Sequence, residues 1–370
     1  MGEYARFLEI GQRRLPQPPR TGESLAGKRV LVTGGTGCIG TELLRQLARL
    51  GCRELACLAN RSGPEVEGVH YWRGDIRDIG PLMARGWDAV FHTAAQRDPG
   101  LAERQQRLTV ATNVFGMAAA LAAAERCGVE RFVYASTGKA LRPFSPDTYT
   151  ATKRVAECLL AQSTIPRRSG ARFTHVVDNS IIHERLLRWA RAGEPIRLHA
   201  DGIIFYAQSA IESAQLLIGA AEHAGTGAAE IHAIRDLGIP VDLTAMTAEM
   251  IHDLGSSSLI QVVGYDSGYE ETPFPGLYDP DTAFDHSPLI NAFEADTAHQ
   301  PYEAVDAFPL RFGRRVEVSG DLEADSWRVM ESAVAAVRPE LAERIADLAR
   351  SKCTDPTHSR MLKIIEEQGG

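Results

Sequence analysis

The sequence predicts an α/β protein: a doubly wound parallel sheet with a smaller, interleaved carboxyl-terminal lobe. Between residues 28 and 264, short apolar runs of strand length alternate with longer segments of helical periodicity, a pattern typical of parallel sheets covered by helices. A glycine-rich loop joins the first apolar run to the first helical segment. The chain has 370 residues, of which 44% are hydrophobic, so it can bury a substantial core.

Charge and composition exclude several classes of partner. The formal net charge is −8 without any basic run, which makes nucleic acid and anionic membranes poor candidates. The longest apolar stretch, around residues 117–124, falls short of the roughly 18 residues that a membrane-spanning helix needs. The amino terminus lacks an apolar signal core, so we expect a cytoplasmic protein. His286 and His299 lie at irregular spacing and no C-x-x-C pair occurs, so we expect no metal site.

The first 25 residues form a polar arm that contains prolines, and packing on the body or mediating assembly are both open to it. Residues 28–33 follow as an apolar strand, then the loop GGTGCIG, then a helical pattern over residues 41–50. Glycines between a strand and a helix let the backbone approach a pyrophosphate closely, where free N–H groups favour anions. The loop therefore predicts dinucleotide binding, with contacts from Gly34, Thr36, Gly37, Cys38, Ile39 and Gly40.

The second strand, residues 54–59, ends in Asn60-Arg61-Ser62. A carboxylate at this position would bind the adenosine ribose of NAD and repel a 2′-phosphate, whereas an arginine attracts one. We therefore expect NADP as cofactor, held by Asn60 and Arg61. The alternative is that Arg61 is an ordinary solvated loop residue.

Three more positions along the sheet suggest cofactor contacts. A strand over residues 69–73 precedes Asp75-Ile76, where Asp75 could accept from the adenine amino group or cap the next helix. The strand over residues 89–92 ends in Thr93-Ala94-Ala95, small enough to leave room for a ribose. A long helix over residues 101–127 carries Asn113, which could order a water or backbone near the site or be a buried amide satisfied by backbone.

The segment from residue 131 to residue 153 carries the predicted chemistry. A buried strand over residues 131–135 ends in Ser136-Thr137, and Tyr149 and Lys153 stand four apart, on one face of a helix. An adjacent ammonium favours a phenolate, which can exchange a proton with a substrate hydroxyl near neutral pH. Thr137 can hold the same oxygen. Only five of the 40 basic residues are lysines, and two of them fall in this segment; lysine, unlike arginine, can give up its proton.

The remaining elements complete the predicted architecture. Strands are expected over residues 172–177, 230–234 and 259–264, and helices over residues 181–192, 209–224 and 241–254. We divide the chain into an arm (1–25), an NADP-binding domain (26–178, with 204–236 returning to it), a substrate lobe (179–203 and 237–320) and carboxyl-terminal helices (321–370).

These residues resemble an extended short-chain dehydrogenase/reductase with a Rossmann-like fold. The match is carried by residues 33–40, Asp75, Thr93-Ala94-Ala95, Asn113, Thr137, Tyr149 and Lys153. Residues 136–143, STGKALRP, are similar to the S-T-D-K-A-x-x-P signature of the capsular polysaccharide biosynthesis family, which includes inverting UDP-N-acetylglucosamine 4,6-dehydratases. The resemblance implies NADP, and a Lys139 that removes a carbon-bound proton. The acid that it implies for water loss is replaced by Gly138.

We therefore expect an NADP-dependent enzyme that oxidises a secondary hydroxyl of a nucleotide-activated sugar to a transient ketone, followed by epimerisation or dehydration. The predicted catalytic residues are Thr137, Tyr149, Lys153 and Lys139, with Tyr149 and Lys153 also touching the cofactor. Arg97, Thr137 and Asn179 are the expected substrate contacts. The alternative is a simple NADP(H)-dependent dehydrogenase or ketoreductase acting on a small sugar-like natural-product intermediate. We expect the chain to form homo-oligomers.

Overall fold

The computed structural model describes residues 2–16, 24–141, 148–264, 286–290, 292–295 and 297–312, together with residues 315 and 318. Within these ranges, nine strands form one sheet in the order β14-β15-β11-β6-β5-β4-β1-β2-β3. All pairs from β3 to β11 are parallel, and β15 and β14 extend the sheet in antiparallel fashion. The predicted doubly wound parallel sheet is therefore confirmed. The predicted carboxyl-terminal helices, residues 321–370, lie outside the described residues.

The strands of this sheet are β1 (Arg29–Thr33), β2 (Glu54–Ala59), β3 (His70–Arg73), β4 (Ala89–His92), β5 (Arg131–Ala135), β6 (Arg167–Ala171), β11 (Glu230–Ile234), β14 (His299–Tyr302) and β15 (Val305–Pro309). The chain order reverses between β1 and β4. In open α/β sheets, ligands bind beyond the carboxyl ends of the strands at such a reversal. The glycine loop directly follows β1 and so lies at this edge of the sheet. The carboxyl end of β5 lies at the same edge.

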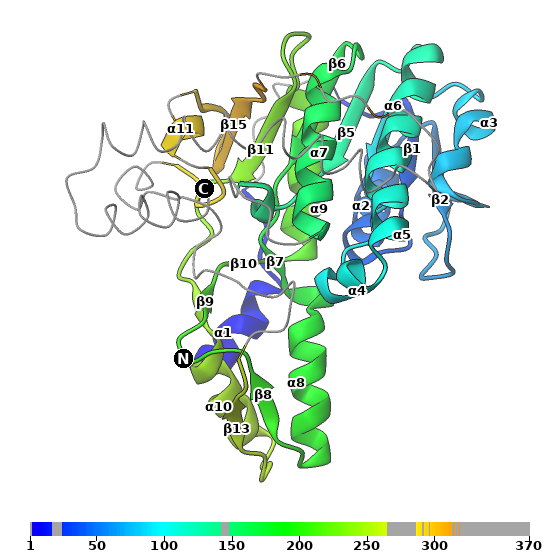
Figure 1. The fold of residues 1–370 in the computed structure, drawn as a ribbon. Coiled ribbons are helices and arrows are strands. Elements are labelled where there is room, and N and C mark those ends of the chain that lie inside the picture. The colour runs from blue at the N-terminus through cyan, green and yellow to red at the C-terminus, as the bar shows by residue number, and fades with distance from the viewer. Residues whose placement is uncertain are drawn as a thin grey trace.

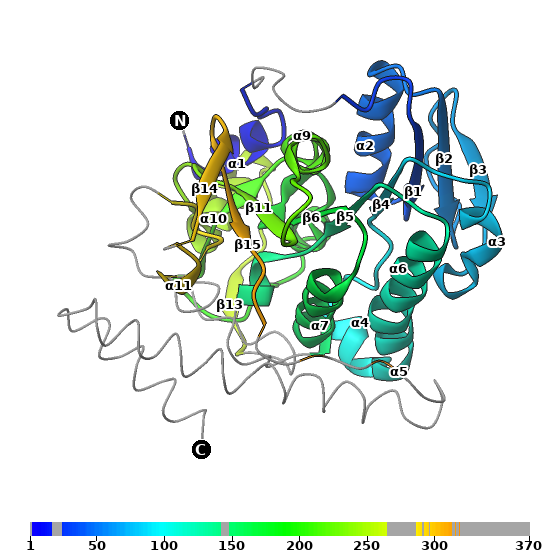
Figure 2. The same ribbon diagram turned by 90° about the horizontal axis from the view of Figure 1, so that it is seen from above.

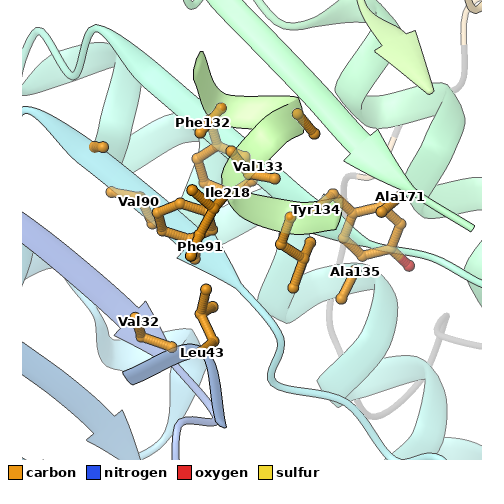
Figure 3. Packing of buried hydrophobic residues seen from close by; sticks show 14 of the residues in the cluster. Val32, Leu43, Val90, Phe91, Phe132, Val133, Tyr134, Ala135, Ala171 and Ile218 are labelled. Atoms are coloured by element: carbon orange, nitrogen blue, oxygen red, sulfur yellow. The ribbon is translucent and has the colours of Figure 1, made fainter. Parts of the chain in front are cut away.

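Helices cover both faces of the sheet (Figure 2). One face carries α2 (Cys38–Arg49) and α9 (Ala210–His223), and the other carries α6 (Gly116–Arg126) and α7 (Thr148–Gln162). A short 3-10 turn, η1 (Ile76–Asp78), and α3 (Gly80–Met83) follow β3. In the core, Leu43 of α2 and Ile218 of α9 reach the same face, near Val32, Val90 and Phe91 (Figure 3).

The sixth strand differs from the prediction. It spans Arg167–Ala171 rather than residues 172–177, and the chain leaves the sheet at Arg172. Its sequence, RRSGA, does not look like a buried strand, because two arginines open it. Arg168 Nη1 donates to the carbonyl of Ile165 at 2.8 Å, so its charged end stays at the strand edge. A Cβ on Gly170 would meet Ile231 Cδ1 at 2.7 Å and the carbonyl oxygen of Tyr134 at 3.0 Å, so a glycine suits the close packing between β5, β6 and β11.

The predicted long helix over residues 101–127 is broken into pieces. They are α4 (Pro99–Arg104), α5 (Gln106–Val110), a π-helical turn η2 (Ala111–Phe115) and α6, with a non-helical Gln105 between the first two. The run Gln106–Arg126 is long and apolar enough to cross a membrane by length and composition alone, unlike the shorter stretch expected from the sequence. Its most apolar window is 61% buried inside the protein, as the core helix of a globular sheet protein would be.

A second group of elements lies beyond one end of the sheet (Figure 1). It contains α1 (Glu3–Ile10), β7 (His175–Val176), η4 (Val177–Asn179), α8 (Ile181–Ala192), β8 (Ile196–Leu198), β9 (Ile204–Phe205), β10 (Ala207–Gln208), β12 (Val241–Asp242), α10 (Leu243–Asp253) and β13 (Ile260–Val262). The amino-terminal helix packs into the core of this group, where Phe7 is fully buried. Of the two roles left open for the arm, packing on the body is therefore the one observed for residues 3–10.

The large sheet also takes in strands that the sequence placed in the smaller lobe. Both β14 and β15 lie within residues 237–320, yet they pair with the sheet through β11. Between β13 and β14, the segment 286–290 contributes Leu289 and Ile290 to the core of the large sheet, and Ala295 of α11 (Ala292–Ala295) packs against that core. Ser287 N donates to Asp306 Oδ2 at 2.7 Å, which fixes this segment to β15. The other predicted domain boundaries stay predictions.

Candidate active site

The glycine loop brings three chain segments into close contact at the switch point of the sheet. Gly34 has φ +75°, and a Cβ on it would lie 2.6 Å from the backbone nitrogen of Ala94, at the end of β4. A Cβ on Gly40 would lie 2.5 Å from the carbonyl oxygen of Gly34. Gly37 occupies the N-cap position of α2 and has no side chain to cap it. The backbone is thus bare where the first-turn N–H groups of α2 point outward, a fit for a pyrophosphate.

The loop that follows β2 carries one arginine and is contacted by another. Asn60 and Arg61 are exposed, and Thr36 Oγ1 of the glycine loop donates to the carbonyl of Arg61 at 3.3 Å. Arg73 Nη2, at the end of β3, donates to Ser62 Oγ at 3.0 Å. Sequence reasoning singled out Arg61 but missed Arg73. The feature that could have identified Arg73 is its position as the last residue of β3, the strand that pairs with β2.

The carboxylate of Asp75 is hydrogen-bonded to a neighbouring residue, Arg77. Its Oδ1 accepts from the backbone N–H of Arg77 at 2.9 Å, so it caps η1, and Oδ2 accepts from Arg77 Nη2 at 2.7 Å. The hydrogen bonds from Arg77 lower the pKa of Asp75, although partial burial raises it. The capping alternative therefore holds, and a contact with adenine stays a prediction. Ile76 is buried, and its Cγ2 packs tightly against Gly116 of α6.

Asn113 ties α7 to the loop after β4. Its Oδ1 accepts from the backbone N–H of Gln96 at 2.8 Å, and its Nδ2 donates to the carbonyl of Gln96 at 3.0 Å and to Thr152 Oγ1 at 3.0 Å. The alternative of a buried amide satisfied largely by backbone therefore holds, and a role for Asn113 beside the cofactor stays a prediction. It sits in the π-helical turn, a feature often found at functional sites.

The loop after β4 is anchored to β1. Thr93 Oγ1 donates to the carbonyl of Thr33 at 2.7 Å, and the backbone N–H of Ala94 faces Thr33 Oγ1 at 3.4 Å. Thr93, Ala94 and Ala95 are half-buried. They border the glycine loop, as the contact between Gly34 and Ala94 requires.

The strand end and helix predicted to carry the chemistry do come together. Lys153 Nζ donates to the carbonyl of Ala135 at 2.8 Å, which joins α7 to the carboxyl end of β5. The ammonium lies 6.0 Å from the ring centre of Tyr149 and 4.9 Å from that of Tyr134. Tyr149 is half-buried, whereas Tyr134 is 2% exposed. Lys153 therefore stands between two phenols, one inside the core and one at its border.

Around the strand end, Thr137 and Lys139 are half-buried, and Thr137 Oγ1 accepts from the backbone N–H of Lys139 at 3.3 Å. Thr137 directly precedes the short turn η3 (Gly138–Leu141), and Lys139 lies within it. The hydroxyl of Thr137 keeps a hydrogen to donate, because only its oxygen is used in that bond.

Burial sets the electrostatics of this site. It lowers the pKa of Lys153 to about 7, and the charge of Glu157 opposes that shift. Burial, with a smaller effect from Lys153, lowers the pKa of His92 to about 3. His92 Nδ1 lies 2.9 Å from Thr33 Oγ1, and the ring stays neutral at physiological pH. Lys153 is therefore a cation only up to near neutral pH, which suits a group that responds to proton transfer beside it.

Gly138 lies where the resemblance implies an acid. Its N–H donates to the carbonyl of Phe173 at 2.8 Å. A Cβ on this residue would meet Leu289 Cδ2 at 2.7 Å. Leu289 is fully buried and comes from the segment 286–290. The space that an acidic side chain would need first is therefore filled by an apolar one.

Two predicted substrate contacts remain, Arg97 and Asn179. Arg97 is exposed in the loop after β4, and its charge acts on Cys38 at the start of α2, whose pKa is raised chiefly by burial. Asn179 closes the turn η4, and its side chain lies outside the described part of the structure. Among the described residues, no group of three or more histidine, cysteine, aspartate or glutamate side chains could hold a metal ion.

An edge that fits a dinucleotide and a Tyr-x-x-x-Lys helix at the same end of a doubly wound sheet are the features of an extended short-chain dehydrogenase/reductase. Residues 30–162 match the model of the NAD dependent epimerase/dehydratase family. The resemblance stated from the sequence is thereby confirmed.

Curated relatives match part of the chain, and a solved structure shares its fold. The chain is 26% identical to the probable polysaccharide biosynthesis protein EpsC of Bacillus subtilis, over 62% of this chain and 41% of that protein. It is 28% identical to the inverting UDP-N-acetylglucosamine 4,6-dehydratase of Campylobacter jejuni, over 43% of this chain and 51% of the relative. The chain thus spans about half or less of these relatives. The UDP-glucose 4-epimerase of Thermus thermophilus, solved with NAD, shares the fold, with TM-score 0.57, 22% identity, and 69% and 92% coverage of the two chains.

Proposed function

We propose that this protein uses NADP to oxidise a secondary hydroxyl of a nucleotide-activated sugar to a transient ketone, which is epimerised before it is reduced again. The observation that carries the proposal is the position of Lys153, between the end of β5 and the ring of Tyr149. The polysaccharide-related names of the relatives support a sugar nucleotide as substrate.

Each proposed catalytic residue has one role. Tyr149 accepts the proton of the substrate hydroxyl, because the nearby Lys153 ammonium favours its phenolate. Thr137 donates a hydrogen bond to the same substrate oxygen and so orients it. The bound nicotinamide supplies the site that takes up and returns the hydride. Lys139 removes the proton on the carbon next to the ketone, which the carbonyl has made acidic.

Gly138 favours epimerisation over dehydration. Water loss requires an acid to protonate the departing hydroxyl, and general acid catalysis typically contributes about 100- to 10,000-fold. Position 138 offers no such group, and Leu289 fills the adjoining space. Epimerisation needs Lys139 to remove the proton on one face and a proton donor, protein or water, to supply one on the opposite face, so it needs no acid at position 138.

The experiment that tests the reaction type is incubation with a panel of UDP- and dTDP-sugars followed by mass spectrometry and chromatography. We expect a product of unchanged mass that elutes as a new stereoisomer, without net change in the cofactor. A loss of 18 mass units would identify dehydration and contradict the role given to Gly138. Stoichiometric consumption of NADPH would instead identify the alternative, a simple dehydrogenase or ketoreductase.

The proposed cofactor preference rests on Arg61, and Arg73 contacts the same loop through Ser62. We expect Arg61→Ala to weaken NADP binding by about 10- to 100-fold, the size expected for the loss of one hydrogen bond to a charged group. Binding of NAD by the same variant is the internal control and should change little, because NAD lacks the 2′-phosphate. Calorimetric titration with both cofactors measures this. A wild-type protein that binds NAD more tightly than NADP would contradict the proposal.

Homo-oligomer formation stays a prediction.

A further inference from the structure

Behind the proposed catalytic residues lies a buried cluster of four charges that sequence reasoning missed. Glu157 and Arg172 are fully buried, and Arg154 and Glu294 are nearly so. Arg172 Nη2 donates to Glu157 Oε2 at 2.9 Å, and Arg172 Nη1 donates to Glu294 Oε2 at 2.7 Å. Arg154 Nη1 donates to Glu157 Oε2 at 3.2 Å. Two carboxylates and two guanidinium groups thus balance each other in charge.

Glu157 links this cluster to the end of β5. Its Oε1 accepts from Ser136 Oγ at 2.6 Å and from Arg172 Nε at 3.0 Å. Burial raises the pKa of Glu157, but the charge and hydrogen bonds of Arg172 hold that pKa below its usual value, so the side chain is a carboxylate. Ser136 immediately precedes Thr137, the residue proposed to orient the substrate oxygen.

The other side of the same turn is held by the same cluster. Arg154 Nη1 donates to the carbonyl of Ala140 at 3.1 Å. Thr137 therefore lies between two anchored points, Ser136 and Ala140, both bonded to members of the cluster. A buried cluster of charges is weak evidence for stability, because apolar residues of similar shape often serve as well. Its position around the turn points to a role in the site.

Glu157 also faces Lys153. The two residues stand four apart on α7, so their side chains are neighbours on one helix face. Around the Lys153 ammonium, β5 contributes the Tyr134 ring and the Ala135 carbonyl, β4 contributes neutral His92, and α7 contributes the Tyr149 ring. Glu157 is the carboxylate that opposes the effect of burial on Lys153.

We propose that Glu157 is a positioning residue of this site: it fixes Thr137 through Ser136 and keeps a negative charge one helical turn from the Lys153 ammonium. It touches neither the substrate nor the cofactor. The inference rests on the proposed function for its meaning in catalysis. Its electrostatic part is measurable without any turnover, so the two can fail separately.

The test is an NMR titration of the intact protein with lysine labelled by ¹³C at Cε. The chain has only five lysines, and a Lys153→Met variant assigns the relevant signal. We expect Glu157→Gln to lower the titration midpoint of Lys153 by about one pH unit or more, the effect of removing an adjacent opposite charge. Glu294→Gln is the matched control, because it removes the other carboxylate of the same arginine.

We expect Glu294→Gln to leave the Lys153 midpoint within a few tenths of a pH unit of wild type, because Glu294 pairs with Arg172 and Glu157 is the carboxylate that acts on Lys153. Glu157→Asp keeps the charge and should retain most of the wild-type midpoint. The proposal is overturned if Glu157→Gln causes no shift, or if both glutamine variants shift the midpoint equally. If Glu157→Gln does not fold, an aspartate variant displaced by about a unit overturns it.

Discussion

Tyr149→Phe should reduce turnover of the sugar nucleotide by about 100- to 10,000-fold, the range typical for loss of a general acid–base group. The ring and its packing stay, because only the hydroxyl is removed. The nearby ammonium of Lys153 then has no phenolate to stabilise. We expect KM to change much less than kcat, because the hydroxyl takes part in proton transfer and not mainly in ground-state binding. Steady-state kinetics on the converted sugar nucleotide measures the effect.

Tyr134→Phe is the matched control for this prediction. The ring of Tyr134 lies closer to Lys153 Nζ than the ring of Tyr149, at 4.9 Å against 6.0 Å. Its hydroxyl is buried without a hydrogen-bond partner among the described residues, and burial holds its pKa well above the ordinary value. It cannot exchange a proton near neutral pH, so the control should retain most of the activity. Retained turnover in Tyr149→Phe, or equal loss in both, would refute the role of Tyr149.

Lys153→Met should change the pH dependence of stability as well as abolish catalysis. Folding lowers the pKa of Lys153 from 10.5 to about 7. The unfolded chain therefore binds one more proton between these values, and the resulting penalty on folding is full below pH 7 and disappears above 10.5. At about 1.4 kcal/mol per pKa unit, the penalty in wild type falls by about 4 kcal/mol from pH 6 to pH 10. Methionine carries no such penalty.

The free energy of unfolding of the variant minus that of wild type should accordingly fall by about 4 kcal/mol between pH 6 and pH 10. Loss of the hydrogen bond to Ala135 lowers the variant's stability by a similar amount at every pH and leaves the slope unchanged. Urea unfolding at several pH values measures the difference. Lys28→Met, at a half-exposed lysine, is the control for removing one positive charge. A difference that does not depend on pH would show that Lys153 is not desolvated in the folded protein.

The epimerisation proposal and the positioning proposal meet at one turn of the chain. Glu157 accepts a hydrogen bond from Ser136, and Arg154 donates one to the carbonyl of Ala140. Leu289 packs against Gly138 between them. Arg172 connects the two sides, because its Nη1 also faces the carbonyl of Leu289 at 3.4 Å. Loss of the cluster should therefore disturb Thr137 and the cover over Gly138 together.

The sequence by itself determined most of the sheet and the placement of the proposed reactive pair, Tyr149 and Lys153. Strands such as Glu54–Ala59 and Arg131–Ala135 were predicted with their observed bounds, because apolar runs between turn signals are local properties. The spacing of Tyr149 and Lys153 fixes them to one helix face whatever surrounds the helix. The strand Arg167–Ala171 escaped because its charged ends are satisfied by partners that its own pattern does not reveal.

Only the tertiary structure decided how this pair is supported. The partners of Arg172 lie 15 and 122 positions away, in Glu157 and Glu294. Leu289, which comes much later in the sequence, packs against Gly138. Asn113 accepts a hydrogen bond from the backbone N–H of Gln96. Such contacts follow from how strands are ordered and how helices pack on them. Periodicity along the chain predicts which face of each element is buried. It does not predict which distant side chain fills the space beside that face.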